Sequence, residues 1–329
     1  MKSKALFVTL LCLFGSALGL SQVLREVRVT EIPGVVMAGA KWTLAWSGTD
    51  NADGIVGTAD GGLIFAQEQP NQVSKLDKDD RVSVLLKDTH GAGSLSMDSK
   101  GRILAVLRTC TDPGNAGRGI TAPCTEPTAV AILSPERKTL ADNFEGKSFG
   151  RPNDLVAAKN GGVYFNSGVT YYVSPRGQVS SIGKDLRTNG IMLSPDEKTL
   201  YVTNGPVVVA FDIQPDGTVK NQRDFAKLEA GGNGDGMTVD AAGRLYVTSG
   251  ASGVQVFSPE GKYLGVVPTP RSVASVAFSG PDKKTLYVTG AGALGPDGKE
   301  FKTPEGVRNN AKSIFKIPML AQGFKGRAK

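Results

Sequence analysis

A turn followed by two strand-like segments recurs along most of the chain, and this repeat restricts the possible folds more than any other feature. Each turn contains Gly or Asp, and the segments after it are rich in β-branched and aromatic residues. Successive units lie roughly 40 residues apart, the period of a four-stranded propeller blade. The six turns begin at Asp60, Lys100, Asn160, Asp196, Ala242 and Asp282. We therefore predict an all-β, six-bladed β-propeller that forms one domain over residues 21–329.

Four of the units carry a second β-branched segment with its own turn, which is typical of the hairpin partner of the first strand. These segments are Val73–Asp77, Ala129–Leu133, Val207–Asp212 and Gly253–Ser258. A propeller must also close its ring, because closure removes free sheet edges. We expect Val35–Trp46 or Ser313–Ile317 to supply the closing strand.

The composition fits this architecture and argues against one class of partner. Hydrophobic residues make up 40% of the 329 residues, and 42 Gly with 18 Pro favour many tight turns. The formal net charge is +7. However, the Arg residues are not interleaved with aromatic residues in the way that base stacking requires. We therefore expect a solvated basic surface and no nucleic-acid partner.

The N-terminus has the pattern of a secretory signal peptide over residues 1–20. Lys2 and Lys4 precede an apolar run, Ala5–Phe14, that is too short to span a bilayer. The segment Ala17–Gly19 offers the small residues that signal peptidase requires. We therefore expect a secreted or periplasmic protein with no membrane attachment after cleavage.

The longest gap between two units contains an inserted surface loop at about residues 109–127. Cys110 and Cys124 lie in it, and they are the two cysteines that remain after signal cleavage. In an oxidising compartment we expect them to form a disulfide, which would contribute on the order of 3 kcal/mol in the chain-entropy model. The alternative is a pair of free thiols on a surface loop.

Polar clusters occupy the same position in three successive repeats, just before a short apolar segment. They are Arg151-Pro152-Asn153-Asp154, Thr188-Asn189-Gly190 and Gly234-Asp235-Gly236-Met237. Asp53 and Ser275 hold the matching positions in the first and last units. Residues just before the innermost strand of a blade lie at one mouth of the central channel, so these side chains should converge. Asn and Asp oxygens, in a chain with one His, suit a hard divalent cation.

Three stretches together resemble the SMP-30/gluconolactonase/LRE-like family, one in each of three successive blades. They are Phe149–Val156, Asn189–Asp196 and Gly234–Asp240. A single Asn-Gly or Asp-Gly pair is more often a turn cap, but three motifs in the family's order are a specific signal. The resemblance implies a propeller with one divalent ion, Ca²⁺ or Zn²⁺, near the mouth of the channel.

Within this resemblance, Asn189 and Asp235 match metal ligands of the family, and Arg151 and Asn153 match residues that contact the substrate or a water on the metal. The third family ligand is a Glu of the first blade. Its best match here is Asp53, which is one methylene shorter. This departure allows four outcomes: contact with the ion through a water, an ion that sits off-centre, weaker metal binding, or an altered reaction.

These features predict a divalent-metal-dependent hydrolase that opens a sugar lactone such as gluconolactone. The ion would stabilise negative charge on the carbonyl oxygen, and Asp235 or Asp154 would accept a proton from the attacking water. Asp154 could instead face the metal. Arg151 would orient sugar hydroxyls or a carboxylate.

Two alternatives remain open for the same site. One is an esterase or organophosphate hydrolase that uses the same metal, and the other is a propeller that binds a ligand without turnover. For each of these functions we expect a small-molecule lactone, ester or similar ligand as the partner of a monomer or weak dimer.

Overall fold

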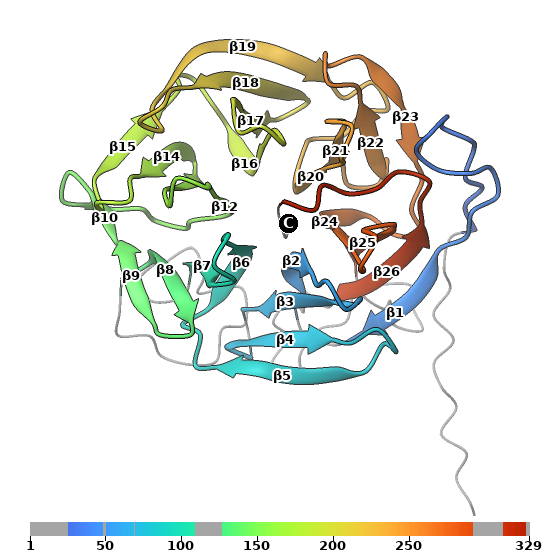
Figure 1. Ribbon diagram of the computed structural model, residues 1–329, viewed down its shortest axis with the longest axis horizontal. Helices are drawn as coiled ribbons and strands as arrows, with labels where there is room; N and C mark the ends of the chain where they lie inside the picture. The colour runs from blue at the N-terminus through green and yellow to red at the C-terminus, as the bar shows by residue number, and fades with distance from the viewer. Residues whose placement is uncertain (1–25, 49–50, 69, 109–126, 292–311, 327–329) are drawn as a thin grey trace, which may run out of the picture.

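The computed structural model of the protein describes residues 26–48, 51–68, 70–108, 127–291 and 312–326. Six antiparallel, four-stranded sheets stand around a central axis in a closed ring (Figure 1). The prediction of an all-β, six-bladed propeller is confirmed. The expected signal peptide at residues 1–20, nearly all of the loop at about 109–127, and both Cys110 and Cys124 lie outside the described residues.

The first five blades follow one another along the chain, and each begins with its innermost strand. Blade 1 contains β2 (Asp53–Gly57), β3 (Leu63–Gln67), β4 (Gln72–Leu76) and β5 (Val82–Lys87). Blade 2 contains β6 (Ala92–Met97), β7 (Ile103–Leu107), β8 (Ala129–Ser134) and β9 (Lys138–Ala141). A short hairpin of β10 (Asn143–Phe144) and β11 (Lys147–Ser148) leads to blade 3, which contains β12 (Leu155–Ala157), β13 (Val163–Ser167), β14 (Val169–Val173) and β15 (Val179–Ile182). Blade 4 contains β16 (Thr188–Leu193), β17 (Thr199–Asn204), β18 (Val207–Ile213) and β19 (Val219–Lys227). Blade 5 contains β20 (Met237–Val239), β21 (Leu245–Thr248), β22 (Val254–Phe257) and β23 (Tyr263–Val267).

Blade 6 joins the two ends of the sequence and closes the ring. It contains β24 (Val273–Ser279), β25 (Thr285–Ala291), β26 (Lys312–Pro318) and, as its outermost strand, β1 (Thr43–Ser47). β1 pairs antiparallel with β26, with Thr43 opposite Lys316 and Ser47 opposite Ser313. Both predicted closing segments are therefore used, because the first overlaps β1 and the second lies within β26.

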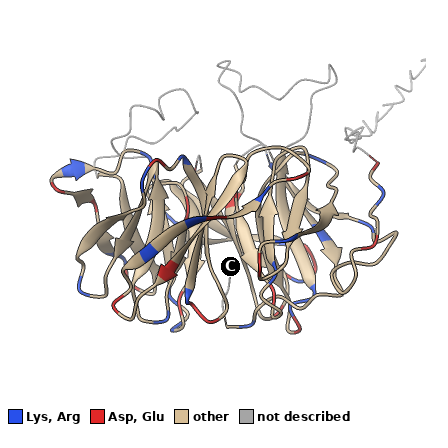
Figure 2. Ribbon diagram, turned by 90° about the horizontal axis from the view of Figure 1, so that it is seen from above, with Lys and Arg blue, Asp and Glu red and all other residues tan. Residues whose placement is uncertain are grey.

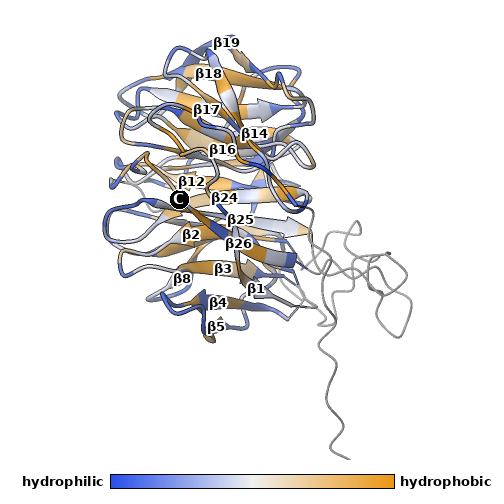
Figure 3. Cartoon of the chain, turned by 90° about the vertical axis from the view of Figure 1, so that its right-hand side faces the viewer, coloured by the Kyte–Doolittle hydropathy of each residue, from blue (hydrophilic) through white to orange (hydrophobic). Residues whose placement is uncertain are grey.

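Burial decreases from the axis to the rim. The innermost strands β12 and β20 are buried at every residue, whereas the outermost β5 is exposed at nearly every residue. An inner strand has a neighbouring blade on each face, so it can be a continuous apolar run. Figure 3 shows the apolar strand interiors between polar loops, and Figure 2 shows the charged residues mainly on turns and outer strands.

Two of the repeated turns recognised in the sequence share a hydrogen-bond pattern between an Asp and an Arg. The carboxylate of Asp98 accepts hydrogen bonds from the backbone N–H of Arg102 at 2.9 Å and from its Nε at 2.7 Å. Asp240 accepts the same pair of bonds from Arg244. Gly101 supplies the positive φ of 75° that this tight turn requires. The turn therefore follows from local sequence and ends the innermost strand at a defined residue.

The described part of the C-terminal segment after β26 runs toward the axis at one end of the propeller (Figure 1). The backbone N–H of Gly323 donates to the carbonyl of Lys283 at 2.8 Å, and that of Phe324 donates to the carbonyl of Val239 at 3.1 Å. Val239 is the last residue of β20, whereas Asp235 precedes its first. The segment therefore lies at the end opposite the polar clusters. Within the described residues, no helix is long and apolar enough to cross a membrane.

Candidate active site at the propeller axis

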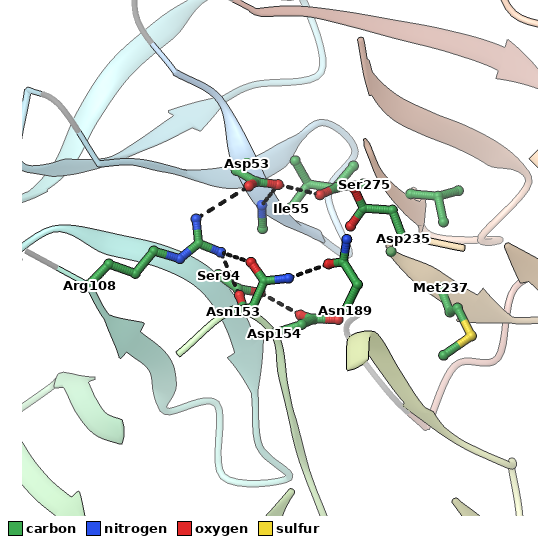
Figure 4. Close-up of a pocket in the computed structure, with 13 residues that line it drawn as sticks. Asp53, Ile55, Ser94, Arg108, Asn153, Asp154, Asn189, Asp235, Met237 and Ser275 are labelled. Atoms are coloured by element: carbon green, nitrogen blue, oxygen red, sulfur yellow. Dashed lines mark hydrogen bonds and ion pairs between the residues drawn. The ribbon is translucent and has the colours of Figure 1, made fainter. Parts of the chain in front are cut away.

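Side chains from all six blades meet where the innermost strands begin (Figure 4). They surround a cavity of about 20 Å³, which is enough for about one water molecule or ion. The residues around it are Asp53, Gly54, Ile55, Ser94, Arg108, Asn153, Asp154, Asn189, Asp235, Gly236, Met237, Ser275 and Val276. The structure thus brings together the polar residues predicted from five blades, with the exception of Arg151.

Glycine is required after the polar residue because neighbouring blades touch at that point. A Cβ on Gly190 would lie 1.9 Å from the carbonyl oxygen of Asp235 in the next blade. A Cβ on Gly54 would lie 2.2 Å from the Cα of Ser94, again in the next blade. The Asn-Gly and Asp-Gly pairs therefore combine a functional side chain with a close backbone contact.

Bulges at the start of the inner strands direct these side chains. The pairing of an inner strand with its neighbour shifts register at the same place in four blades. The shifts lie at Asp53/Val56, Ala92/Ser94, Thr188/Ile191 and Val273/Ser275. A bulge bends a strand and changes where its side chains point, so each of these strands can turn a polar group toward the axis before its apolar run begins.

The carboxylate of Asp235 faces the cavity and, among the described residues, is the one carboxylate there without a fixed partner. Within the described residues, it makes no hydrogen bond or ion pair. Burial raises its pKa to about 7, and the negative charges of Asp53 and Asp154 add to this effect. A carboxyl group in this setting is stabilised as an anion by any cation placed beside it.

Asp53 is already stabilised as an anion. Its Oδ1 accepts hydrogen bonds from Ser275 Oγ at 2.6 Å and from the backbone N–H of Gly54 at 2.9 Å, and its Oδ2 lies 3.5 Å from Arg108 Nη1. Burial acts to raise the pKa of Asp53, but the charges of Arg108 and Lys312 and these hydrogen bonds outweigh it and lower the pKa below 3.8. Asp53 and Asp235 are therefore neighbouring carboxyl groups whose pKa values are shifted in opposite directions.

Asp154 ties three blades together. Its Oδ1 accepts hydrogen bonds from Ser94 Oγ at 2.6 Å and from the backbone N–H of Leu155 at 2.9 Å. Its Oδ2 accepts one from the backbone N–H of Ile191 at 3.0 Å. Both oxygens are thus engaged, which makes Asp154 better suited to hold the blades in place than to accept a proton during a reaction.

The side-chain amides of Asn153 and Asn189 lie next to each other at the edge of the cavity (Figure 4). Asn153 Nδ2 donates to Asn189 Oδ1, and Asn153 Oδ1 accepts from Arg108 Nη2 at 2.9 Å. The backbone carbonyls of Asn189 and Gly190 accept hydrogen bonds from the side chain of Asn166. These contacts fix the orientation of both amide groups.

Arg151 does not line the cavity but is held close to it. Its Nη1 and Nη2 form a two-pronged ion pair with Glu68, at 2.7 Å and 2.8 Å. Glu68 also lies 3.3 Å from Arg108 Nη1. The side chains of Glu68 and Arg108 are only 6% and 4% exposed, so these charges are removed from solvent and depend on one another.

Sequence reasoning missed Arg108, Glu68 and Ser94. Glu68 directly follows β3 and Arg108 directly follows β7. A charged residue at the end of an apolar second strand, in two successive blades, was the available signal. A turn residue would be the simpler interpretation of either one, and only the fold shows that Arg108 reaches the axis and that Glu68 pairs with it.

The oxygen donors at the axis suit a hard divalent cation. Asp53, Asn189 and Asp235 present carboxylate and amide oxygens, the ligands that Ca²⁺ prefers, whereas Zn²⁺ favours His and Cys. Within the described ranges, no cluster of three or more His, Cys, Asp or Glu side chains could hold a metal. An ion at the axis would therefore depend on the amide oxygen of Asn189 as well as on the carboxylates.

The fold and the axial cluster define a six-bladed propeller with a polar site on its axis. The family model described as "SMP-30/Gluconolactonase/LRE-like region" matches residues 88–292, more than half of the chain. The protein belongs to this family, as its three motifs predicted.

Similar proteins of known activity share part of the sequence. A gluconolactonase of Zymomonas mobilis is 31% identical over 191 residues, which cover 49% of this chain and 53% of the relative. A pentonolactonase of Haloferax volcanii is 29% identical over 187 residues, which cover 53% of this chain and 64% of the relative. The chain thus spans between about half and two thirds of the length of these relatives.

Solved structures share the fold at lower identity. A gluconolactonase from Xanthomonas campestris superposes with a TM-score of 0.67 at 22% identity, covering 89% of this chain and 94% of that one. A calcium-binding regucalcin from Agrobacterium tumefaciens superposes with a TM-score of 0.62 at 17% identity, covering 85% of this chain and 96% of that one. At these identities the likeness concerns the fold alone.

Proposed function

We propose that the protein is a hydrolase that opens a small lactone, with a sugar lactone such as gluconolactone as the first candidate substrate. Family membership and the named activities of the relatives support this proposal. The observation that carries it is the Asp235 carboxyl group, which faces the axial cavity with a pKa raised by burial to about 7. A group with this pKa can accept a proton at neutral pH.

Lactone opening needs a base, a donor for the carbonyl oxygen and a means of orienting the ring. Water attacks the carbonyl carbon, the ring C–O bond breaks, and an acid and an alcohol result. Asp235 accepts the proton of the attacking water. Asn153 donates an N–H to the carbonyl oxygen as negative charge develops there. Arg151, fixed by Glu68, orients the hydroxyl groups of the substrate.

A divalent cation belongs to the proposal as a cofactor. Asp53, Asn189 and Asp235 would hold it, and when bound it supplies positive charge that stabilises the oxyanion of the opening lactone. The donor set favours Ca²⁺ over Zn²⁺, because oxygen ligands predominate. Asp53 contributes less than a free carboxylate would, since Ser275 and Arg108 already occupy its oxygens.

The test is hydrolysis of gluconolactone in a pH-stat, with protein stripped by a chelator and then supplied with Ca²⁺, Zn²⁺ or no metal. We expect metal-dependent turnover that falls at least about 100-fold in Asp235→Asn, which keeps an oxygen at the site but removes the base. Lys284→Met, on the exposed turn at the far end of the channel, is the control and should retain full activity.

Other outcomes separate the alternatives. Turnover of aryl esters or organophosphates but of no lactone would favour the esterase reading of the same site. Tight metal binding without turnover of any of these substrates would favour a propeller that only binds a ligand. In that case, the ion pair between Asp53 and Arg108 would be the first structural feature to examine as the cause of the missing turnover.

We also propose that the mature protein is secreted or periplasmic. The charged start, short apolar run and small residues within 1–20 support this. Mass spectrometry of the protein purified from cell fractions tests it. A mature N-terminus near residue 21 in the periplasm or medium is expected, and an intact Met1 in the cytoplasmic fraction would refute it.

A further inference from the structure

Arg108 is the most highly connected side chain at the axis, yet its role follows from no motif in the sequence. Its Nε donates to the carbonyl of Pro152 at 3.0 Å. Its Nη2 donates to the backbone carbonyl of Asn153 at 2.5 Å and to the side-chain Oδ1 of the same residue at 2.9 Å. Nη1 faces Asp53 and Glu68. One guanidinium from blade 2 thus contacts blades 1 and 3.

The absence of a side chain at Gly93 leaves the space that the Arg108 side chain occupies. A Cβ on Gly93 would lie 1.9 Å from Arg108 Nε and 2.1 Å from its Cδ. Gly93 therefore lets the guanidinium lie directly over the backbone of β6. Glu68 fixes the other edge, and it is itself held by Arg151. A long, flexible side chain is in this way confined to one conformation.

Arg108 determines which way the Asn153 amide points. A guanidinium carries only donors, so the Asn153 atom that meets Nη2 must be the oxygen Oδ1. The nitrogen Nδ2 then faces the cavity, where it donates to Asn189 Oδ1. The Asn189 amide is oriented in turn, with its oxygen toward Asn153 (Figure 4). Asn153 is therefore a hydrogen-bond donor at the cavity, and the charge of Arg108 on its oxygen strengthens that donor.

We propose that Arg108 is a positioning residue for the lactone reaction, acting through Asn153 and supported by Glu68. It holds the Asn153 N–H toward the carbonyl oxygen of the substrate and keeps the Asn189 oxygen turned toward Asn153. This inference deepens the proposed lactonase function and rests on it for its kinetic consequences. Its structural part, the fixed orientation of the two amides, stands apart from turnover.

The kinetic test is a double-variant cycle of Arg108→Met and Asn153→Ala. We expect each single variant to lower kcat on the order of 100-fold with little change in KM, because a donor to a developing oxyanion acts in the transition state. The double variant should be no slower than Asn153→Ala alone, since Arg108 acts through that amide. Arg108→Lys should restore part of kcat, because it keeps a positive donor near Oδ1.

Asn153→Asp gives a sharper variant of the same test. The aspartate keeps an oxygen for Arg108 and nearly the same shape, but it cannot donate to the substrate. We expect its kcat to fall about as far as that of Asn153→Ala, while its melting temperature stays close to that of the wild type. Retention of wild-type kcat by Asn153→Asp would overturn the donor role.

The second readout does not depend on activity. In a protein with ¹⁵N-labelled Asn, the side-chain NH₂ signals of Asn153 and Asn189, assigned by Asn153→Asp and Asn189→Asp, should be resolved and slow to exchange. Both should shift or broaden in Arg108→Met and in Gly93→Ala, which displaces the guanidinium without removing it. Arg102→Met is the matched control, because it removes an Arg–carboxylate pair from the distant turn of the same blade.

The outcomes keep the two proposals apart. If the wild-type protein turns over no lactone, the proposed function fails, and the NH₂ signals still decide the orientation. If the wild type is active but the cycle is additive, or the signals are the same in Arg108→Met as in Arg102→Met, the positioning role of Arg108 is refuted while the proposed function stands.

Discussion

Cation binding at the axis should weaken steeply as the pH falls below 7, because a proton and a cation compete for Asp235. The pKa of this carboxyl group is raised to about 7 by burial and by the charges of Asp53 and Asp154. It is then about 90% ionised at pH 8 and about 1% ionised at pH 5, so the apparent affinity for Ca²⁺ should fall about 100-fold between these values. The lowered pKa of Asp53 keeps that group ionised over the same range.

Titration calorimetry of the chelator-stripped protein with Ca²⁺ at pH 5, 6, 7 and 8 measures this dependence. Asp235→Asn is the control, because its side chain has no proton to lose and its affinity should vary little with pH. The raised pKa also means that the folded state loses stability as the pH rises from about 4 to about 7, so Asp235→Asn should melt higher than the wild type at pH 8. A wild-type affinity that is constant from pH 5 to pH 8, or an equal slope in Asp235→Asn, would refute the reasoning.

Three further predictions concern the scaffold around the site. Burial lowers the pKa of Lys283 from 10.5 to about 8, so the free energy of unfolding should rise as the pH rises from 8 to 10.5. Lys283→Met should therefore add about 3 kcal/mol to the free energy of unfolding at pH 7. An unchanged melting temperature by calorimetry, with Lys284→Met as the control, would contradict this. Gly190→Ala should force blades 4 and 5 apart, because its Cβ would lie 1.9 Å from the Asp235 carbonyl oxygen. We expect the free energy of unfolding in urea to fall by at least about 2 kcal/mol and Ca²⁺ binding to weaken. Unchanged Ca²⁺ binding would exclude the close-contact role of Gly190. Asp154→Ala should lower the free energy of unfolding by about 3 kcal/mol in the same assay, because it leaves the buried N–H of Ile191 without its acceptor. A loss below about 1 kcal/mol would show that other groups replace the carboxylate.

The blade repeat, the turns and the position of the polar clusters were predictable because they depend on short-range chemistry. The Asp98 and Asp240 turns close on an Arg four residues away, and the glycine in them is needed for the backbone conformation of the turn itself. The positions of Asn189 at the start of its strand and of Asp235 just before its strand follow from the same local pattern. With six such units in one chain, the ring and the convergence of these clusters follow from geometry.

Sequence reasoning left open which segment closes the ring, and the structure uses both candidates. β1 and β26 are far apart in the chain, and their pairing from Thr43 to Ser47 depends on the whole ring having the correct circumference. Strand propensity marks both segments as strands, but it carries no information on which partner each will find. Sheet pairing over such separations is decided by packing.

The chemical state of the axial residues also lay beyond the sequence. Asp53, Asp154 and Asp235 look alike as residues at or just before the start of a strand. Yet Asp53 is held by Arg108 and Ser275, Asp154 ties three blades together, and Asp235 faces the cavity with its pKa raised to about 7. The partners that make this difference come from other blades.

The amino-acid sequence by itself determined the blades, their turns and the ring of Asn and Asp residues, because turn chemistry and strand alternation act between residues close in the chain. Only the tertiary structure decided that Arg108 reaches the axis, that Glu68 pairs with both Arg108 and Arg151, and that the Asn153 amide points its nitrogen inward. The reason is that hydrogen bonding and charge act over a few ångströms of space, and at the axis those few ångströms separate residues that lie tens of positions apart in the chain.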